Sequence, residues 1–215
     1  AASCSMATTN LADRLINVTQ SAFAKFGEGY GLAEGGNAIG AANAVVSGED
    51  FRRNNAPYIN QLFLGTNGGP GGPAADGWVT YGLPVAAGLM LRDSVEIDEL
   101  KHPMQVRYLR IMTGTGGAGR HRGAPAMEMA YGPTADSMEV LWPCDGTVYP
   151  PRGVRGGLDG LPCRHWKVSA NGNEEELPSV GAITLRPGEA VRGNQAGGGG
   201  YGSPLERDPQ RVLRD

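Results

Sequence analysis

Three adjacent side chains, Arg120, His121 and Arg122, follow a run of glycines in this 215-residue chain. Arginine binds carboxylates and phosphates through paired hydrogen bonds, and successive backbone amides without bulky side chains can form an anion-binding nest. The pattern therefore predicts an anion site in which Gly117 and Gly119 lie beside the three side chains. The residues leave a second interpretation open, in which the arginines pair with carboxylates across a domain or subunit contact.

The same stretch satisfies the G-x-G-x-x-G pattern of dinucleotide-binding proteins between Gly114 and Gly119. That fingerprint requires a helix to begin at its last glycine, so that the helix N-terminus receives the pyrophosphate. Here Gly123 and Pro125 would interrupt such a helix before it completes a turn. The chain also lacks G-x-x-x-x-G-K-[ST], so we expect no nucleotide to bind through either motif.

Cysteines and histidines are few and widely spaced. The three cysteines contain no C-x-x-C pair, and the three histidines contain no H-x-x-x-H or H-x-H pair, so the sequence assigns no metal site. We expect reduced thiols that are buried or half-buried, because free cysteine is among the most buried residue types. The residues concerned are Cys4, Cys144, Cys163, His102, His121 and His165.

Composition excludes several classes of protein. A net charge of −3 and a pI of about 5.7 give no basic footprint for nucleic acid. No apolar run is long enough to span a membrane, and the N-terminus lacks the basic and apolar regions of a secretion signal. We therefore expect a cytoplasmic protein with neither nucleic acid nor membrane as a partner. Since the chain does not begin with Met, we also expect a processed product, a trimmed chain or part of a longer polypeptide.

The first half predicts one amphipathic helix and glycine-rich loops. An apolar stripe recurs every three or four residues between Leu11 and Phe26, and Gly27 follows as a stop signal. A short strand is expected near residues 58–64, before the glycine- and proline-rich segment 65–73. Four acidic residues between Asp93 and Glu99 predict a solvated helical face.

The second half predicts short strands separated by turn signals. Strands are expected near 106–112, 126–131, 137–142, 166–170, 182–185 and 189–192, and their spacing favours antiparallel pairing over βαβ units. No linker divides the chain. The fold class is therefore α+β, a single unit over 1–215, with the helix and glycine-rich loops in 1–105 and an antiparallel or sandwich-like β-rich half in 106–215.

Several segments together resemble one known family. The segment from Gly197 to Asp215 resembles the closing signature of the hydantoinase B/oxoprolinase family, and Leu185-Arg186-Pro187-Gly188-Glu189 precedes it as in that family. The block from Gly116 to Gly123, the Gly68–Pro73 run before Asp76-Gly77-Trp78, and Thr8-Thr9-Asn10 also resemble family elements in the family's order.

The resemblance implies a subunit, or a C-terminal fragment, of an ATP-dependent multi-subunit enzyme. Such enzymes hydrolyse a cyclic amide or carboxylate a ketone after phosphoryl activation of the substrate by an A-type, ATP-binding partner. ATP and a divalent metal are then expected in the complex, through partner subunits, and no cofactor is assigned to this chain alone. Phosphoryl transfer itself depends mainly on positioning and charge stabilisation.

The chain departs from the family in length and in one motif. It resembles only the C-terminal portion of a B-type subunit, without the Asp- and His-rich metal segment, so a second chain is expected to supply the N-terminal half. The region after Trp78 lacks the paired histidines of many hydantoinase-type members, which leaves the carboxylase branch at least as well supported.

No catalytic residue is assigned from the sequence. The predicted contacts to substrate or anion are Gly117, Gly119, Arg120, His121, Arg122, Gly198, Gly199 and Tyr201. The glycine-rich loops are expected to line a site or channel at a subunit junction, or to wrap partner subunits. Two alternatives remain open: a non-catalytic structural subunit that completes a larger catalytic partner, and an independent module that binds a small ligand.

Overall fold

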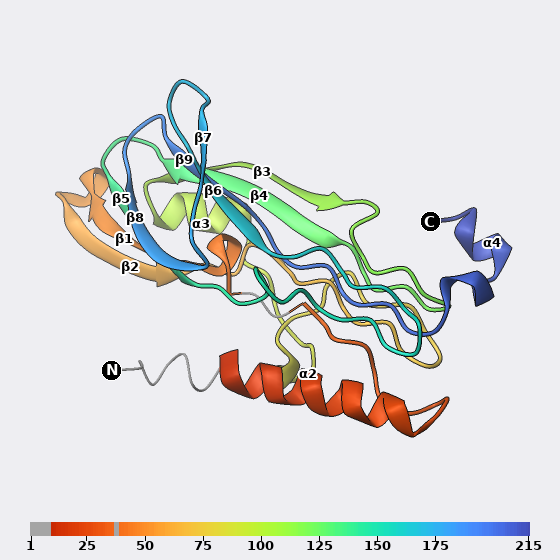
Figure 1. The fold of residues 1–215 in the computed structure, drawn as a ribbon. Helices are drawn as coiled ribbons and strands as arrows, with labels where there is room; N and C mark the ends of the chain where they lie inside the picture. The colour runs from red at the N-terminus through yellow and green to blue at the C-terminus, as the bar shows by residue number, and fades with distance from the viewer. Residues whose placement is uncertain (1–9, 37–38) are drawn as a thin grey trace.

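Two antiparallel sheets pack face to face at one end of the molecule (Figure 1). The computed structural model describes residues 10–36 and 39–215. One sheet has the order β2-β1-β5-β8 and the other the order β3-β4-β9-β6-β7. The strands are β1 (Val45–Asp50), β2 (Ala56–Gln61), β3 (Met104–Met112), β4 (Ala126–Pro133), β5 (Met138–Pro143), β6 (Arg164–Val168), β7 (Glu174–Glu176), β8 (Val180–Leu185) and β9 (Ala190–Asn194).

The apolar core lies between the two sheets. Val46 and Val140, paired across β1 and β5, face Met129 and Val191 from β4 and β9, and all four side chains are buried. The alternation of buried and exposed residues along β5 is that expected of a strand with one face on the core. The α+β class and the antiparallel β-rich half are thus confirmed, and each of the six strands predicted in the second half is present.

The first half contains more strand than the sequence predicts. β2 begins at Ala56, close to the expected strand, but β1 was not predicted because Gly48, Glu49 and Asp50 interrupt its apolar pattern. Gly48 allows a close contact inside the sheet, because a Cβ there would lie 3.0 Å from the Tyr58 hydroxyl. The division into a helix-and-loop half and a strand half therefore does not hold, since β1 and β2 belong to the four-stranded sheet.

The glycine-rich segments pack on one another, beyond the open end of the sandwich (Figure 1). We call this assembly the glycine bundle; it comprises residues 31–36, 67–78, 115–124, 151–161 and 196–202. Within its central segment, 196–202, the amides of residues 197–201 donate to a different neighbouring segment at each step, and the segments recur after three residues. The bonds run from Gly197 to Leu161, Gly198 to Ala124, Gly199 to Glu34, Gly200 to Leu158 and Tyr201 to His121.

A three-residue cycle is the periodicity of the polyproline II helix, whose backbone groups point outward in three directions. Neighbouring segments approach so closely that side chains are excluded. A Cβ on Gly198 would lie 1.9 Å from the Gly69 carbonyl oxygen, and one on Gly117 would lie 2.0 Å from that of Leu158. The abundant glycine therefore lets segments that the sequence predicts as loops pack backbone against backbone in a bundle.

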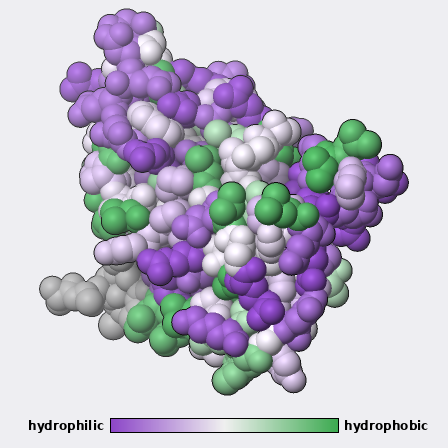
Figure 2. Space-filling model, turned by 45° about the vertical axis from the view of Figure 1, so that its right-hand side comes forward, coloured by the Kyte–Doolittle hydropathy of each residue, from purple (hydrophilic) through white to green (hydrophobic). Residues whose placement is uncertain are grey.

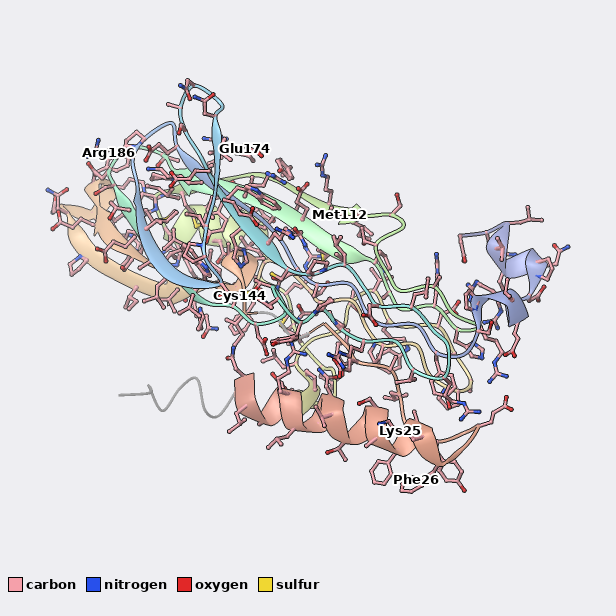
Figure 3. The ribbon with its side chains drawn as sticks, in the orientation of Figure 1. Lys25, Phe26, Met112, Cys144, Glu174 and Arg186 are labelled. Carbon is pink, nitrogen blue, oxygen red and sulfur yellow. The ribbon has the colours of Figure 1, made fainter. Side chains whose placement is uncertain are left out.

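Helix α2 (Ala12–Phe23) lies along this bundle and continues as a 3-10 turn to Phe26. Its extent agrees with the prediction. The apolar stripe faces outward, with Leu15 59% and Phe26 73% exposed, whereas Asp13 and Asn17 are buried. Figure 3 shows Phe26 pointing away from the bundle, and Figure 2 shows hydrophobic surface along the lower edge, where α2 runs.

The inward face of α2 is polar because its packing partner is backbone. Asn17 donates to the carbonyl of Gly35 at 3.2 Å and accepts from the amide of Gly35 at 3.1 Å. Asp13 accepts from the amide of Val85 at 2.6 Å. Apolar side chains there would leave these buried backbone groups without partners. Among the described residues, two further α-helices are α3 (Val95–Lys101), beside β3, and α4 (Pro209–Val212), near the C-terminus.

Candidate functional site

The predicted residues Arg120, His121 and Arg122 lie at the end of the glycine bundle that is remote from the sheets, close to Tyr201. His121 and Tyr201 exchange backbone hydrogen bonds of 3.0 and 2.8 Å, so these two predicted residues lie side by side. Gly119 lies against the same pair, because a Cβ there would be 2.7 Å from the Tyr201 nitrogen. The structure therefore brings five of the eight predicted positions into one region: Gly119, Arg120, His121, Arg122 and Tyr201.

The remaining predicted glycines lie inside the bundle. The amide of Gly117 donates to Gly198, that of Gly198 to Ala124, and that of Gly199 to Glu34. These amides are occupied by carbonyl oxygens. They therefore hold the neighbouring segments in place, and at these three glycines they are not free to bind an anion as the predicted nest of backbone amides would.

The arginines at this end face carboxylates. Arg120 pairs with Glu28 and lies 4.0 Å from Glu206. Arg122 lies 3.3 Å from Asp215, and its side chain is 37% exposed. These carboxylates belong to the same chain, whereas the open interpretation of the sequence placed such pairs across a domain or subunit contact. Of the two arginines, Arg122 keeps the larger exposed surface.

Asp76 is the centre of this charge network. It accepts two hydrogen bonds from Arg207, at 2.8 and 2.9 Å, and one from the amide of Arg122 at 2.9 Å. Burial acts to raise the pKa of Asp76, but the bonds from Arg207 and from the Arg122 amide outweigh it and hold the pKa below its ordinary value. Asp76 is therefore a carboxylate at neutral pH.

Arg207 closes the network from the C-terminal segment. Besides Asp76 it binds both carboxylate oxygens of Asp215 and the carbonyl of Arg120, and it is only 9% exposed. Two paired carboxylates hold its pKa above the ordinary arginine value, even though burial opposes the charge. The sequence analysis included Arg207 in the family signature but not in the site.

His121 is held neutral beside this network. Its Nδ1 lies 3.8 Å from Asp76 and is buried without a hydrogen-bond partner among the described residues. Burial lowers the pKa of His121; Asp76 opposes that effect, and the nearby arginines reinforce it. A neutral imidazole next to a fixed carboxylate can accept a proton or a hydrogen bond from a ligand.

A mainly apolar cavity of about 360 Å³ lies between α2 and the glycine bundle, next to the charge network. Asp76 lines it together with Trp78, Tyr81 and Leu32. Burial raises the pKa of Tyr81 to about 12, so its hydroxyl remains a donor at neutral pH. A cavity of this size with a few polar groups at one edge is typical of a small-molecule site.

Comparison with known proteins identifies the chain's relatives. A sequence profile described as hydantoinase B/oxoprolinase matches residues 1–204. The chain belongs to the hydantoinase B/oxoprolinase family. The caprolactamase subunit beta of Pseudomonas jessenii is 30% identical over 184 residues, which cover 81% of this chain and 31% of that protein.

Solved structures give the same result for this family member. The crystal structure of ATP-dependent caprolactamase from Pseudomonas jessenii superposes with a TM-score of 0.71 and 25% identity, over 86% of this chain and 32% of that one. A nucleotide-free acetone carboxylase structure also gives 0.71, at 17% identity over 94% of this chain and 30% of that one, and so shares the fold. The chain spans about a third of the length of the relatives that it matches.

The divalent metal implied for the family has no evident hard-ligand site in the part of the chain that the structure describes. Within residues 10–36 and 39–215, one group of three candidate ligands comes together, and it consists of Cys144, Cys163 and His165. Sulfur and imidazole suit zinc or copper(I), whereas magnesium and manganese favour oxygen ligands. These residues therefore do not fit the hard divalent metal that accompanies ATP.

Sequence reasoning did not bring these three residues together. Cys144 follows β5 and Cys163 precedes β6, so folding makes the contact across two sheets. The prediction of buried, reduced thiols is confirmed for both, while Cys4 lies outside the described residues. One signal was available: Cys163 and His165 are two residues apart at a strand, which places their side chains on one face.

Proposed function

We propose that this chain is part of an ATP-dependent enzyme that opens a cyclic amide or carboxylates a ketone. The observation that carries the proposal is the match to a caprolactamase beta subunit over 81% of the chain. Substrate activation by phosphoryl transfer is assigned to an A-type, ATP-binding partner. The chain itself contributes the glycine bundle and the residues at its remote end.

Within that enzyme, we assign the contact with an anionic or phosphorylated intermediate to Arg120, His121 and Arg122, next to Tyr201. The cavity beside Asp76 supports this assignment because it offers an apolar space next to a charged edge. Arg122 is the more available of the two arginines, since a single contact of 3.3 Å holds its exposed side chain. Gly117, Gly119, Gly198 and Gly199 fix the backbone on which these groups are mounted.

Partner chains are proposed from the exposed face of α2. Four large apolar residues of this helix and its 3-10 extension are each more than half exposed: Leu11, Leu15, Val18 and Phe26. Continuous apolar surface of this kind is typical of a covered interface. We assign its cover to the chain that supplies the N-terminal half of a B-type subunit, since the matched relative is about three times as long as the matched part.

The location proposed is the cytoplasm, in agreement with two buried cysteines that remain unlinked. None of the helices formed by the described residues is both long enough and apolar enough to cross a membrane.

A second candidate is a non-catalytic structural subunit. It is favoured by the pairing of Arg120 with Glu28 and by the occupied amides of the predicted glycines. In this case the bundle serves only to complete the fold of a catalytic partner. Substitution of Arg122 distinguishes the two, because a structural role leaves turnover per assembled complex unchanged.

The test is reconstitution of the chain with an A-type subunit and the N-terminal half of the B-type subunit. We expect ATP hydrolysis to rise when either a lactam or a ketone with bicarbonate is added, and the responding substrate identifies the branch. Each component omitted in turn serves as the control. Assembly with no substrate-dependent hydrolysis for either class would contradict the proposal.

A further inference from the structure

Two thiols and one imidazole converge in the interior where the sandwich meets the glycine bundle. The Sγ atoms of Cys144 and Cys163 lie 3.2 Å apart, and Nε2 of His165 lies 3.7 Å from the Cys163 sulfur. All three residues are buried, with exposures of 5%, 0% and 1%. Figure 3 labels Cys144 at the end of the sheets that adjoins the bundle.

These distances are close to those of a tetrahedral zinc site. Zinc–sulfur bonds of about 2.3 Å and zinc–nitrogen bonds of about 2.0 Å place two sulfurs about 3.8 Å apart, and sulfur and nitrogen about 3.5 Å apart. The observed sulfur–nitrogen distance already agrees, and the two sulfurs need to separate by about 0.6 Å. Rotation of one cysteine side chain is enough for a change of that size.

An oxygen atom lies close enough to the thiols to serve as the fourth ligand. The carboxamide oxygen of Gln195, a fully buried residue, is 3.9 Å from the Cys163 sulfur. Asn43, in the amide orientation that satisfies both of its polar atoms, accepts from Nε2 of Gln195 at 3.0 Å, and this contact keeps the Gln195 oxygen turned toward the thiols. The donor set is therefore two sulfurs, one imidazole nitrogen and one amide oxygen.

The surroundings keep this cluster tightly enclosed. Gly40 lies directly over it, because a Cβ there would be 2.6 Å from Cε1 of His165, 2.9 Å from the Gln195 oxygen and 3.1 Å from the Cys163 sulfur. The Trp142 ring packs against the imidazole with centroids 5.8 Å apart. An enclosed site without an open coordination position is typical of structural zinc, and not of catalytic zinc.

Charge balance favours a metal over a lone thiolate pair. Zinc with charge +2 displaces the two thiol protons, and two thiolates with a neutral imidazole and amide leave the site neutral. A neutral complex can be buried without the penalty of an uncompensated charge. A disulfide would use the sulfurs alone, and would give no reason for His165 and Gln195 to face them.

We propose that Cys144, Cys163 and His165, with Gln195 as fourth ligand, form a structural zinc site that joins the two sheets. Cys144 follows β5 of the four-stranded sheet, while Cys163 directly precedes β6 of the five-stranded sheet and His165 lies in that strand. Asp145, next to Cys144, pairs with Arg14 of α2, so the site also lies at the attachment of that helix. The proposal is independent of the reaction assigned above.

The experiment measures metal in the chain purified with its partners, under reducing conditions and without chelators. Elemental analysis is expected to give one zinc per copy of the chain. Replacement of zinc by Co²⁺ is expected to give the sulfur-to-cobalt charge-transfer bands and the intense visible absorption of tetrahedral thiolate coordination. The Cys163→Ser variant is expected to lose that zinc equivalent and these bands, while His102→Gln, which changes a buried histidine outside the cluster, keeps both.

Failure of Cys163→Ser to fold does not prevent a decision, because the cobalt spectrum of the unaltered protein tests the ligand set directly. Absence of zinc together with absence of thiolate–cobalt bands after Co²⁺ addition overturns the proposal. Isolation of the chain with Cys144 and Cys163 as a disulfide, detected by the loss of two alkylatable thiols, also overturns it. In that case the pair would be a redox cross-link.

Discussion

Substitution of Gly198 by alanine tests the claim that the bundle is built from backbone contacts. The new Cβ would lie 1.9 Å from the oxygen of Gly69 and 2.6 Å from its carbonyl carbon. Because these atoms are backbone, no side chain can rotate away, and two segments must separate. Overpacking of a rigid interior costs about 1–3 kcal/mol.

Separation also weakens hydrogen bonds on both sides of Gly198. Its amide donates to Ala124 at 3.0 Å, and its carbonyl accepts from Gly117 at 2.8 Å. Each bond contributes about 1 kcal/mol net. Together with the steric cost, we expect Gly198→Ala to lose about 3–5 kcal/mol of unfolding free energy, a large part of the stability of an ordinary domain.

Urea unfolding followed by circular dichroism measures this loss, and Gly172→Ala is the matched control. Gly172 has nothing within 4 Å of its missing Cβ, and its φ of +87° lies in the left-handed region. The control should therefore lose only the conformational cost of about 1–2 kcal/mol. Equal losses in the two variants would refute the close packing of the bundle. A loss of partner binding with unchanged stability would instead indicate that this segment wraps a partner, as one interpretation of the sequence had it.

Three other perturbations separate the roles of charged and apolar groups. Arg207→Met should lower the free energy of unfolding by about 2–4 kcal/mol in thermal unfolding, because it leaves the carboxylates of Asp76 and Asp215 without their partner. Arg122→Ala should change that free energy by less than about 1 kcal/mol. If Arg122 contacts the intermediate, the same variant should lower turnover per assembled complex at least about tenfold. Burial, reinforced by the charge of Asp93, raises the pKa of Asp98 from 3.8 to about 6. The free energy of unfolding of the protein should therefore fall as the pH rises from about 4 to about 6. Asp98→Asn should remove this dependence of stability on pH and should be more stable than the unaltered protein by about 1–2 kcal/mol at pH 7. Leu15→Gln should leave the unfolding midpoint unchanged but weaken subunit association about tenfold in sedimentation experiments, while Asn17→Leu should destabilise the chain itself by about 2 kcal/mol.

The strands were predictable because local signals and the tertiary fold agree there. β8 and β9 are separated by Arg186-Pro187-Gly188-Glu189, and both strands begin and end within two residues of the predicted bounds. β1 was not predictable from local pattern, since its stability comes from pairing with β2 and β5 on either side. Propensity is a weak guide for a central strand of that kind.

The structure brings some of the predicted site residues together, and their role in binding stays a prediction. Arg120, His121 and Arg122 do lie together, because they are adjacent in sequence. Asp76 and Arg207 complete the network from 44 and 87 residues away from Arg120, and no spacing rule connects them. The acidic run was expected to be a solvated face, yet Asp98 is 3% exposed, because helix α3 turns it toward the protein.

The outward apolar face of α2 and the glycine content have one physical cause. An amphipathic helix normally turns its apolar side to the protein, since the protein interior is apolar. A bundle made of glycine backbone presents amides and carbonyls, so the helix face that fits it carries Asn17, which binds Gly35. Asp13, on the same face, accepts from the backbone amide of Val85 outside the bundle. The apolar face is then left for another surface. The glycine-rich segments therefore determine, through the orientation of α2, where this chain offers an interface. Replacement of Asn17 should impair the folding of the chain, whereas replacement of Leu15 should impair its assembly with a partner.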